Sequence, residues 1–296
     1  MVCCVLKNQE VVVIIWKSIN VFKPCLLLGV LMLQPSVKVK VRRVDLLKGE
    51  VEVVEDCVSV ETVVMLYVNG ERAATFLSLP SQLEELCIGW LLTQSIIDSV
   101  NDIESVQVEN GKVKVYCSKD VEARLKALDS MAAPARGFET PLNVYFANGL
   151  AKPFVRSKYK VKVEDILSFV RVLDEKAQLF KLTGGTHSAA LFSDGELVAF
   201  AEDIGRHNAV DKVVGLAAMR RVDFSRSVLV STGRQPANMV LKAARVGIPI
   251  VASISAPLYS GVVAAEETGV TLVCFVRGAR MNVYTHPERV AGIPIR

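Results

Sequence analysis

The residues best suited to chemistry in this 296-residue chain gather between positions 183 and 212, where two of its three histidines lie. The first histidine, His187, follows small residues that leave backbone N–H groups accessible: Thr183, Gly184, Gly185 and Thr186. The second belongs to a polar group around an expected helix start: Asp203, Arg206, His207, Asn208 and Lys212. Because polar side chains this dense are hard to explain as core, the segment predicts a binding site for a charged, oxygen-rich ligand.

Each of these side chains also has an ordinary structural interpretation. His187 is able to cap a loop or pair with a carboxylate instead of orienting or protonating a ligand, since an imidazole titrates near neutral pH. Asp203 is expected to set the tautomer of His207 or to pair with Arg206. The adjacent charges at 211–212 have a plain interpretation as a solvated pair on a helix, which contributes little stability.

Alternating strands and helices around this segment predict a layered α/β domain over residues 161–296. A helical stripe occupies 163–173, a hairpin spans 187–201, and a further helix runs from the polar group to about 217. Strands are then expected at 227–231, 248–255 and 270–276, with helices at 237–246 and 262–268 that end at the left-handed C-caps Gly247 and Gly269. Strand–helix–strand order implies right-handed crossovers and a parallel sheet.

The carboxyl ends of these strands carry three loops rich in hydroxyl, glycine and guanidinium groups. They contribute the candidate ligand-binding residues Ser231, Gly233, Arg234, Ser255, Arg277, Gly278, Ala279 and Arg280. Ligands bind at this edge of parallel α/β sheets, helix N-termini favour phosphate, and arginine binds phosphate with two parallel hydrogen bonds. The loops therefore predict a nucleotide-like or pyrophosphate ligand; ordinary turns with surface arginines are the alternative.

Residues 36–130 predict a smaller hairpin-and-helix region, and residues 131–160 an irregular loop containing several prolines and glycines. Asn69-Gly70 and Asn110-Gly111 each separate two strand-like runs and predict hairpins. Ser81 and Glu84 form a capping-box pattern before a helix, and another helix is expected at 122–128. The apolar face of the first helix comprises Leu83, Leu86, Cys87, Trp90 and Leu91.

Composition excludes several classes of protein. A net charge of +4 is too small to indicate a nucleic-acid-binding protein. The seven cysteines show neither zinc-site spacing nor a disulfide framework, so reduced thiols, a cytoplasmic location and no bound metal are expected. Two apolar runs, at 11–16 and 26–33, fall short of the roughly 20 residues that cross a bilayer. We interpret residues 1–35 as an apolar extension or a misassigned start before Met32, with a weak membrane or partner anchor as the alternative.

The ordered motifs resemble the FdhD family of formate dehydrogenase accessory proteins, which are sulfur carriers for the molybdenum cofactor. The similarity rests on residues 183–187, 205–212, 231–234, 242–249, 255–257 and 277–289, with 68–71 and 83–86 upstream. It implies an α+β protein with a cytidine-deaminase-like layered α/β domain. It also implies that the molybdenum guanine-dinucleotide cofactor is bound as cargo, with a GDP-like nucleotide as a smaller ligand. Because 275–280 matches a family segment implicated in cofactor contact, Phe275 and Val276 join the candidate residues.

The family pattern contains a Cys-x-x-Cys loop whose cysteine carries the sulfur as a persulfide, and this chain differs there. Residues 132–141 fill that interval without a cysteine, and none occurs between Cys117 and Cys274. No catalytic residue is therefore assigned. Zinc deaminase chemistry needs a His-x-Glu and a Pro-Cys-x-x-Cys motif, and it is excluded because the chain contains no Cys-x-x-Cys. Cys87 and Cys274 occupy apolar positions, which leaves Cys117, near Lys114, as the best remaining thiol nucleophile.

Two functions of different kinds remain. In the first, the protein is a sulfur carrier that sulfurates the cofactor for a formate-dehydrogenase-type molybdoenzyme. In the second, it is a cofactor-binding chaperone without sulfur transfer. The resemblance implies a cysteine desulfurase and a second copy of the chain, in a homodimer, as further partners.

Overall fold

The computed structural model describes residues 2–7, 10–15, 34–118, 121–131 and 152–292. They belong to two compact units, Met1–Leu31 and Met32–Arg296. The described part of the first unit is an antiparallel hairpin of β1 (Val2–Lys7) and β2 (Glu10–Ile15). All other elements belong to the second unit. No helix among the described residues is long and apolar enough to cross a membrane.

A mixed six-stranded sheet forms the centre of the second unit, in the order β11-β10-β12-β13-β14-β15. Its strands are β10 (His187–Ser193), β11 (Glu196–Asp203), β12 (Ser227–Ser231), β13 (Ile250–Ser253), β14 (Thr271–Arg277) and β15 (Arg280–Val283). As predicted, β12, β13 and β14 are parallel, because α7 (Ala237–Arg245) and α8 (Tyr259–Thr268) return the chain between them. The remaining neighbours pair antiparallel. The mixed α/β architecture expected from the sequence is confirmed.

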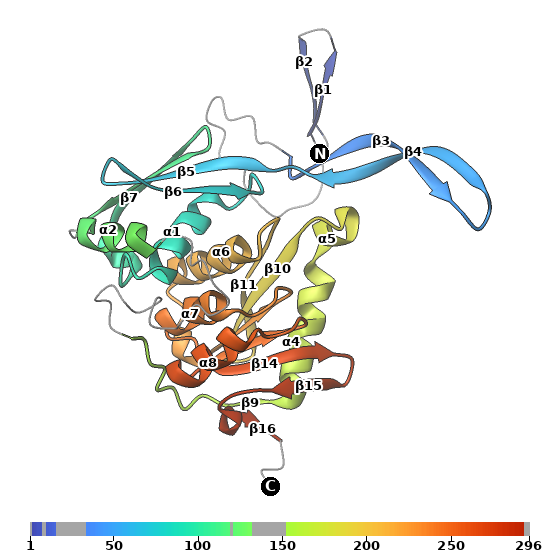
Figure 1. Ribbon diagram of the computed structural model, residues 1–296. Helices are drawn as coiled ribbons and strands as arrows, with labels where there is room; N and C mark the ends of the chain where they lie inside the picture. Colours follow the sequence, from blue (N-terminus) through green and yellow to red (C-terminus); the bar gives the residue numbers. More distant parts are fainter. Residues whose placement is uncertain (1, 8–9, 16–33, 119–120, 132–151, 293–296) are drawn as a thin grey trace. The chain divides into compact units, whose positions relative to one another are not determined.

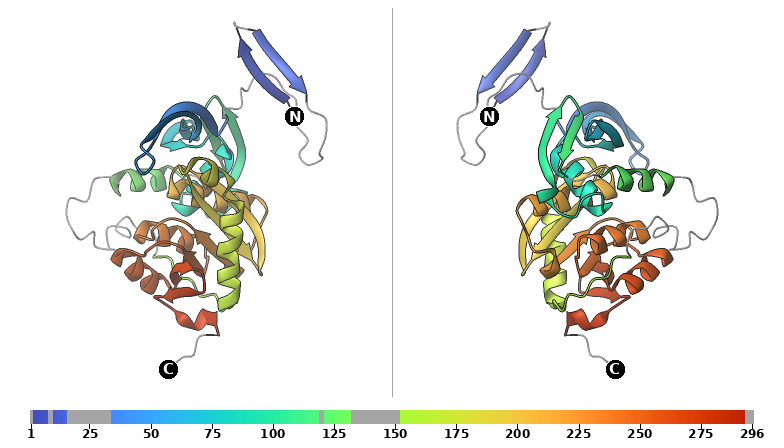
Figure 2. Two further views of the ribbon diagram at one scale, coloured as in Figure 1. Left: turned by 90° about the vertical axis from the view of Figure 1, so that its right-hand side faces the viewer. Right: turned by 90° about the vertical axis from the view of Figure 1, so that its left-hand side faces the viewer.

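Helices cover both faces of this sheet (Figure 1; Figure 2). α4 (Val163–Lys176) packs on one face, and α6 (Arg206–Met219), α7 and α8 pack on the other. Alternation along β10 shows the division, since Ala190 and Phe192 face α4 whereas Ala189 and Leu191 face α6. Phe192 stacks on Phe169 of α4, with ring centroids 4.1 Å apart.

Residues 36–131 form two further sheets and two helices. β3 (Ser36–Asp45) and β4 (Glu50–Ser59) make a two-stranded hairpin. A four-stranded sheet has the order β6-β5-β8-β7, built from β5 (Thr62–Val68), β6 (Glu71–Ser78), β7 (Ile103–Glu109) and β8 (Lys112–Cys117). The two predicted Asn-Gly turns are confirmed, because Asn69, Gly70, Asn110 and Gly111 all have positive φ. The helices are α1 (Leu83–Thr93) and α2 (Glu122–Met131).

Two glycines let α1 pack against α6 at backbone contact distance. A Cβ atom at Gly89 would lie 1.8 Å from the carbonyl oxygen of Asp211, and one at Gly215 would lie 2.0 Å from that of Glu85. Any side chain at either position would force the helices apart. Residues of α1, of α6, of the six-stranded sheet and of the four-stranded sheet consequently share one hydrophobic core.

The capping box predicted from Ser81 and Glu84 is wrong. α1 begins at Leu83, its N-cap is Gln82 in the left-handed conformation (φ 54°), and no side chain caps it. Gln82 Nε2 instead donates a hydrogen bond to the carbonyl oxygen of Phe200 at 3.3 Å. A tertiary contact with β11 therefore accompanies the helix start, one residue later than the capping box requires.

The remaining elements are short. α5 (Gln178–Thr183) follows α4, β9 (Val161–Lys162) pairs in parallel with β16 (Val290–Ala291), and 3-10 turns occupy Val100–Asp102, Phe224–Arg226 and Pro287–Arg289. The buried guanidinium of Arg289 donates to the carbonyl oxygens of Val155, Ser157 and Gly269. It thereby fixes the segment 152–160, which has neither helix nor strand; the rest of the predicted irregular loop, up to 151, lies largely outside the described residues.

A buried ion pair joins Asp203 to Lys212, rather than Asp203 to Arg206 or His207 as the sequence suggested. Asp203 Oδ2 lies 2.6 Å from Lys212 Nζ, and both side chains are 0% exposed. The same carboxylate accepts hydrogen bonds from Ser78 Oγ, Leu79 N, Gly205 N and Asn208 Nδ2 at 2.6 to 3.1 Å. Every acceptor site of this charge is thus occupied by the protein.

A second buried pair joins Asp211 to Lys242 of α7, with Oδ1 2.7 Å from Nζ. Thr93 Oγ1 of α1 donates to the same oxygen at 2.6 Å. The interpretation of Asp211 and Lys212 as a solvated pair is therefore wrong. Adjacent helix positions point in different directions, so these two residues reach different partners inside the core.

Removal of one partner from the Asp203–Lys212 pair should destabilise the fold strongly. We expect Asp203→Ala to lower the free energy of unfolding by about 3–5 kcal/mol, because it leaves a buried ammonium group without a counter-charge. Urea denaturation followed by circular dichroism measures the change. Lys38→Ala is the control: it breaks an ion pair with Glu55 that is more than half exposed, and should cost less than about 1 kcal/mol. Equal losses in the two variants contradict the structural role of the buried pair.

Candidate functional site

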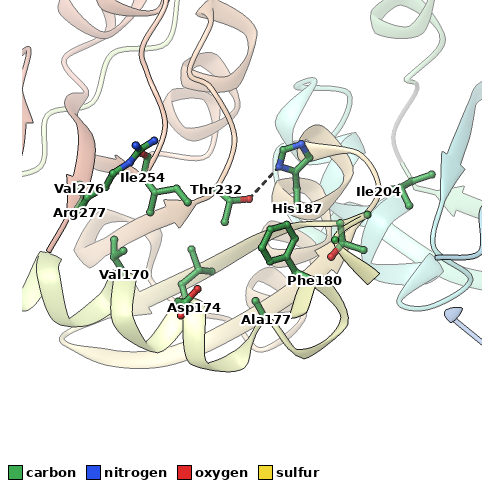
Figure 3. A pocket seen from close by; sticks show the side chains of 14 residues that line it. Val170, Asp174, Ala177, Phe180, His187, Ile204, Thr232, Ile254, Val276 and Arg277 are labelled. Atoms are coloured by element: carbon green, nitrogen blue, oxygen red, sulfur yellow. Dashed lines mark hydrogen bonds between the residues drawn. The ribbon is translucent and has the colours of Figure 1, made fainter. Parts of the chain in front are cut away.

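A cavity of about 620 Å³ opens where the parallel strands end (Figure 3). One wall comes from the ends of β12, β13 and β14, and the other from α4, α5 and the start of β10. We call it the strand-end cavity. Its lining is mostly apolar and comprises Val170, Leu173, Asp174, Ala177, Phe180, Gly184, Gly185, Thr186, His187, Ile204, Thr232, Ile254, Val276 and Arg277.

The Thr183–Gly185 corner of the cavity is shaped by contacts around α5. The carboxylate of Glu202 accepts the N–H groups of Leu179 and Phe180 at 3.0 and 2.8 Å and so holds the start of α5. The helix ends at Gly184, whose φ of 66° suits glycine. Thr183 Oγ1 lies 2.8 Å from Ser59 Oγ of β4. The Thr183 hydroxyl is therefore used in holding this corner, while Gly184 and Gly185 line the cavity.

His187 lines the cavity at the first position of β10. Its Nδ1 lies 3.2 Å from Thr232 Oγ1, which also accepts the N–H group of Ser188 at 3.0 Å. Partial burial, followed by the nearby guanidinium groups of Arg206 and Arg234, lowers the pKa of His187 below its usual value. The imidazole is therefore mainly neutral at pH 7, and a bound anion would make its protonation easier.

Arg206 is the first residue of α6 and packs against Gly233. A Cβ atom at position 233 would lie 2.8 Å from Arg206 Cβ, so a glycine provides the space for this side chain. Arg206 Nε is buried and has no hydrogen-bond acceptor among the described residues. An unpaired donor on a charged group is unfavourable, and the helix N-terminus adds partial positive charge. Arg206 does not line the cavity, but its guanidinium group lies close enough to His187 to lower the pKa of that imidazole.

His207 lies next to Arg206 in sequence but not in the lining of the cavity. Burial, followed by Lys242 and Arg206, lowers the pKa of His207 to about 4. The imidazole is therefore neutral, and it lies near Lys242 of α7. The sequence grouped the two histidines in one site, whereas the structure places only His187 against the cavity.

The first two strand-end loops hold one another in place. Ser231 Oγ accepts a hydrogen bond from Gln235 Nε2 at 2.9 Å, and the Gly233 carbonyl oxygen accepts one from Ser253 Oγ at 2.7 Å. Arg234 is exposed beside them and Ser255 is half-buried. Ser231 and Gly233 therefore shape the loops from inside, and Arg234 is the side chain left to reach a ligand.

The third loop contributes two residues to the cavity. Val276 and Arg277 line it, and Arg277 Nε donates to the carbonyl oxygen of Ile254 at 2.8 Å. Phe275, just before them, has a φ of 53° at an irregularity in the β14–β15 pairing, which turns the strand end. The other predicted residues of this loop, Gly278, Ala279 and Arg280, are exposed and do not line the cavity.

Sequence reasoning missed the wall built by α4 and α5. Val170 and Leu173 belong to the helical stripe predicted for 163–173, but that pattern is the same for a core face and for a cavity wall. Asp174 and Phe180 line the cavity as well and carried no motif of their own. Thr232 was part of a predicted loop, yet only the structure shows its contact with His187.

The cysteines whose side chains are described are poorly placed for nucleophilic chemistry. Cys57 is half-buried, and Cys87, Cys117 and Cys274 are buried. Burial raises the pKa of Cys87 and raises that of Cys274 to about 12; burial, followed by Asp102 and Glu104, raises that of Cys117. Because the thiolate is the nucleophile, Cys117 does not fit the role that the sequence left to it. The interval 132–141 lies outside the described residues.

These features define a layered α/β protein with a cavity at the carboxyl ends of its parallel strands and basic side chains beside that cavity. The chain belongs to the FdhD/NarQ family, whose pattern matches residues 59–291. This confirms the resemblance seen in the sequence motifs.

Individual relatives support the same assignment. The sulfur carrier protein FdhD of Methanothermobacter thermautotrophicus is 38% identical over 227 residues, which cover 77% of this chain and 88% of that protein. The protein of the same name from Saccharolobus solfataricus is 36% identical over 264 residues, covering 85% and 99%. The crystal structure of a candidate formate dehydrogenase accessory protein from Desulfotalea psychrophila has a TM-score of 0.70 and 29% identity, covering 87% of this chain and 100% of that chain.

Removal of a neighbouring positive charge should raise the pKa of His187. We expect Arg234→Gln to shift it upward toward the usual value, because the protonated imidazole loses one repulsive partner. The shift should be partial, since burial is the largest cause of the lowering. A pH titration of the histidine ring protons by NMR measures it. His286, the residue before the 3-10 turn Pro287–Arg289, serves as the internal reference. An unchanged pKa of His187 in the variant contradicts the proximity of Arg234 and His187.

Proposed function

We propose that this protein is a formate dehydrogenase accessory protein that binds the molybdenum guanine-dinucleotide cofactor as cargo at the strand-end cavity. It then supports delivery of that cargo to a formate-dehydrogenase-type molybdoenzyme. The observation that carries the proposal is the basic cluster formed by Arg206, Arg234 and His187 beside the cavity. The names of the relatives, which are sulfur carrier or formate dehydrogenase accessory proteins, support the biological setting.

The charges of the basic cluster are not compensated within the described chain. No carboxylate of the described residues pairs with Arg206 or Arg234, although ion pairs are frequent elsewhere in the unit. The pyrophosphate of a dinucleotide would supply the acceptor that Arg206 Nε lacks. Guanidinium groups bind phosphate through two parallel hydrogen bonds, so Arg206 and Arg234 suit this task.

Arg277 offers a further cation at the opposite side of the cavity. Its Nε is used by the carbonyl oxygen of Ile254, which fixes the direction of the side chain. The terminal nitrogens have no hydrogen bond within the described chain and remain available to a ligand. The cargo keeps its own redox chemistry for the client enzyme; the residues of this chain bind it, orient it and exclude water from its apolar parts.

Sulfur transfer to the cofactor is a second candidate function, favoured by the names of the relatives. It would require a cysteine desulfurase as sulfur donor and a cysteine that reaches the cavity. Among the cysteines whose side chains are described, Cys57 is half-buried and the other three are buried. We therefore place binding and delivery of the cofactor first. We further propose a cytoplasmic protein that acts as a homodimer.

GDP is the simplest probe of the proposed site. We expect calorimetry to show binding of GDP by the wild type. Arg234→Ala and Arg277→Ala should each weaken that binding by about 1.5–3 kcal/mol, the value of a hydrogen bond to a charged group. Arg171→Ala is the control, because Arg171 is an exposed residue of α4 that neither lines the cavity nor is among the charges that shift the pKa of His187. Unchanged affinity in both Arg234→Ala and Arg277→Ala contradicts the phosphate site, and no binding by the wild type contradicts the proposed ligand.

Mass spectrometry distinguishes the two candidate functions. After incubation with a cysteine desulfurase and cysteine, we expect no added sulfur on Cys87, Cys117 or Cys274, because burial raises the pKa of each thiol and blocks access. Denatured protein, in which all thiols are exposed, is the positive control for reactivity. A gain of one sulfur on Cys57, or on Cys3, Cys4 or Cys25, supports sulfur transfer. A gain on a buried cysteine contradicts the burial argument.

A further inference from the structure

Apolar side chains gather at the tip of the hairpin formed by β3 and β4, which we call the arm. The arm tip comprises Val44, Leu46, Leu47, Val51 and Val53, each of which is between 59% and 100% exposed. The turn that carries them is ordered, because Asp45 Oδ1 accepts the N–H groups of Leu47 and Lys48 at 3.0 and 3.1 Å. Exposed apolar side chains that cluster in this way mark a contact surface for another protein.

The stability of the arm does not account for the arm tip. Pairs of opposite charge already link the two strands: Lys38 Nζ lies 3.3 Å from Glu55 Oε2, and Arg43 Nη1 lies 3.6 Å from Glu52 Oε1. A two-stranded hairpin is only marginally stable by itself, and apolar groups stabilise it only once they leave water. Burial of the arm tip by a partner would supply that stabilisation.

The face of the arm that carries much of its tip is also basic. Val44 lies opposite Val51 in the ladder, and Arg42 lies opposite Val53 on the same face, because alternate residues of a strand point to one side. Lys40 follows on that face. Neither Lys40 nor Arg42 forms an ion pair with another described residue. A complementary surface should therefore combine apolar side chains with carboxylates.

A groove of this composition lies on the same chain, beside β7, which is an edge strand of the four-stranded sheet. This β7 groove has a volume of about 520 Å³ and lies between α1, β7 and the end of α6. Its lining includes the apolar residues Ile88, Ile103, Val106 and Met219 and the carboxylates of Glu84 and Glu104. One guanidinium group, that of Arg221, lines it as well, so carboxylates are in excess.

The carboxylates of the β7 groove are available to a partner. Neither Glu84 nor Glu104 forms an ion pair with a residue that the structure describes. Burial, followed by the neighbouring charge of Glu85, raises the pKa of Glu84. A cation brought to the groove would therefore favour the ionised form of this carboxyl group.

We propose that the arm tip of one copy of this chain occupies the β7 groove of a second copy, and that the exchange is reciprocal. The inference rests on the homodimer included in the proposed function and names the surfaces that form it. Within one chain the arm tip and β7 lie on opposite sides of the unit (Figure 1), so the arm does not fill its own groove. Two arms in two grooves make a closed, two-fold symmetric assembly.

Sedimentation velocity on the full chain tests the apolar part of this contact. We expect a wild-type dimer, and we expect the double substitution Leu46→Ser with Leu47→Ser to raise its dissociation constant at least about 100-fold, because four leucine side chains lose their buried contacts. Met219→Asp in the groove should weaken the dimer as well. Leu77→Ser is the matched control: this leucine of β6 is 56% exposed but belongs to neither surface, and its replacement should leave the dimer unchanged.

A charge exchange tests whether the two surfaces meet. Arg42→Glu and Glu104→Lys should each weaken the dimer by on the order of tenfold, and a chain with both substitutions should recover most of that loss, because opposite charges again face each other. Damage to the fold by either substitution would not be repaired by the other. Circular dichroism of every variant confirms that the fold is retained.

The outcomes separate this inference from the proposed function. If the wild type is a dimer that neither the tip nor the groove variants weaken, or that only Leu77→Ser weakens, the dimer uses another face and the inference is overturned while the homodimer stands. If the wild type is a monomer at every concentration measured, the inference and the homodimer are both overturned. Binding of GDP by the same samples still decides the proposed cargo site.

Discussion

The arrangement of the site depends on one buried charge, the carboxylate of Asp203. It lies at the end of β11 and bonds at once to the end of β6, to the turn before α6, and to Asn208 and Lys212 on that helix. A buried carboxylate tolerates no empty acceptor position, so these contacts are mutually required. Arg206 belongs to the turn that Asp203 organises, and its place beside the cavity follows from this network.

Basic side chains gather beside the cavity: Arg206 and Arg234 lie near His187, whereas the lining itself contains one guanidinium group, that of Arg277, and one carboxylate, that of Asp174. Guanidinium groups surround His187 closely enough to lower its pKa, and one of their donors has no acceptor. The buried pairs of the core show that this chain can neutralise charge where stability requires it. No carboxylate of the described residues pairs with Arg206 or Arg234, and this difference from the core is the observation on which the proposal of an anionic ligand rests.

Local patterns were enough to predict three hairpins (β5–β6, β7–β8 and β10–β11), the helices other than α5 and the three parallel strands, because turn residues and apolar periodicity act within a few residues. The hairpins β1–β2 and β3–β4 and the short helix α5 were not predicted. The strand-end loops could be predicted for the same reason, and they do meet along one edge. The partners of Asp203 and Asp211 could not, since Lys242 lies 31 residues from Asp211 and joins it only through the packing of two helices. The wall containing Asp174 and Phe180 was missed because a lining helix and a core helix have the same period.

The contact between Gly89 and Gly215 has a mechanical consequence. Helices in backbone contact cannot slide or roll past each other without atomic overlap, so we expect α1 and α6 to move as one rigid body. Arg206 lies about 14 Å from Gly215 along the axis of α6. Any opening or closing of the cavity would therefore involve the opposite wall, where α5 is short and is held through the carboxylate of Glu202 and the contact between Thr183 and Ser59.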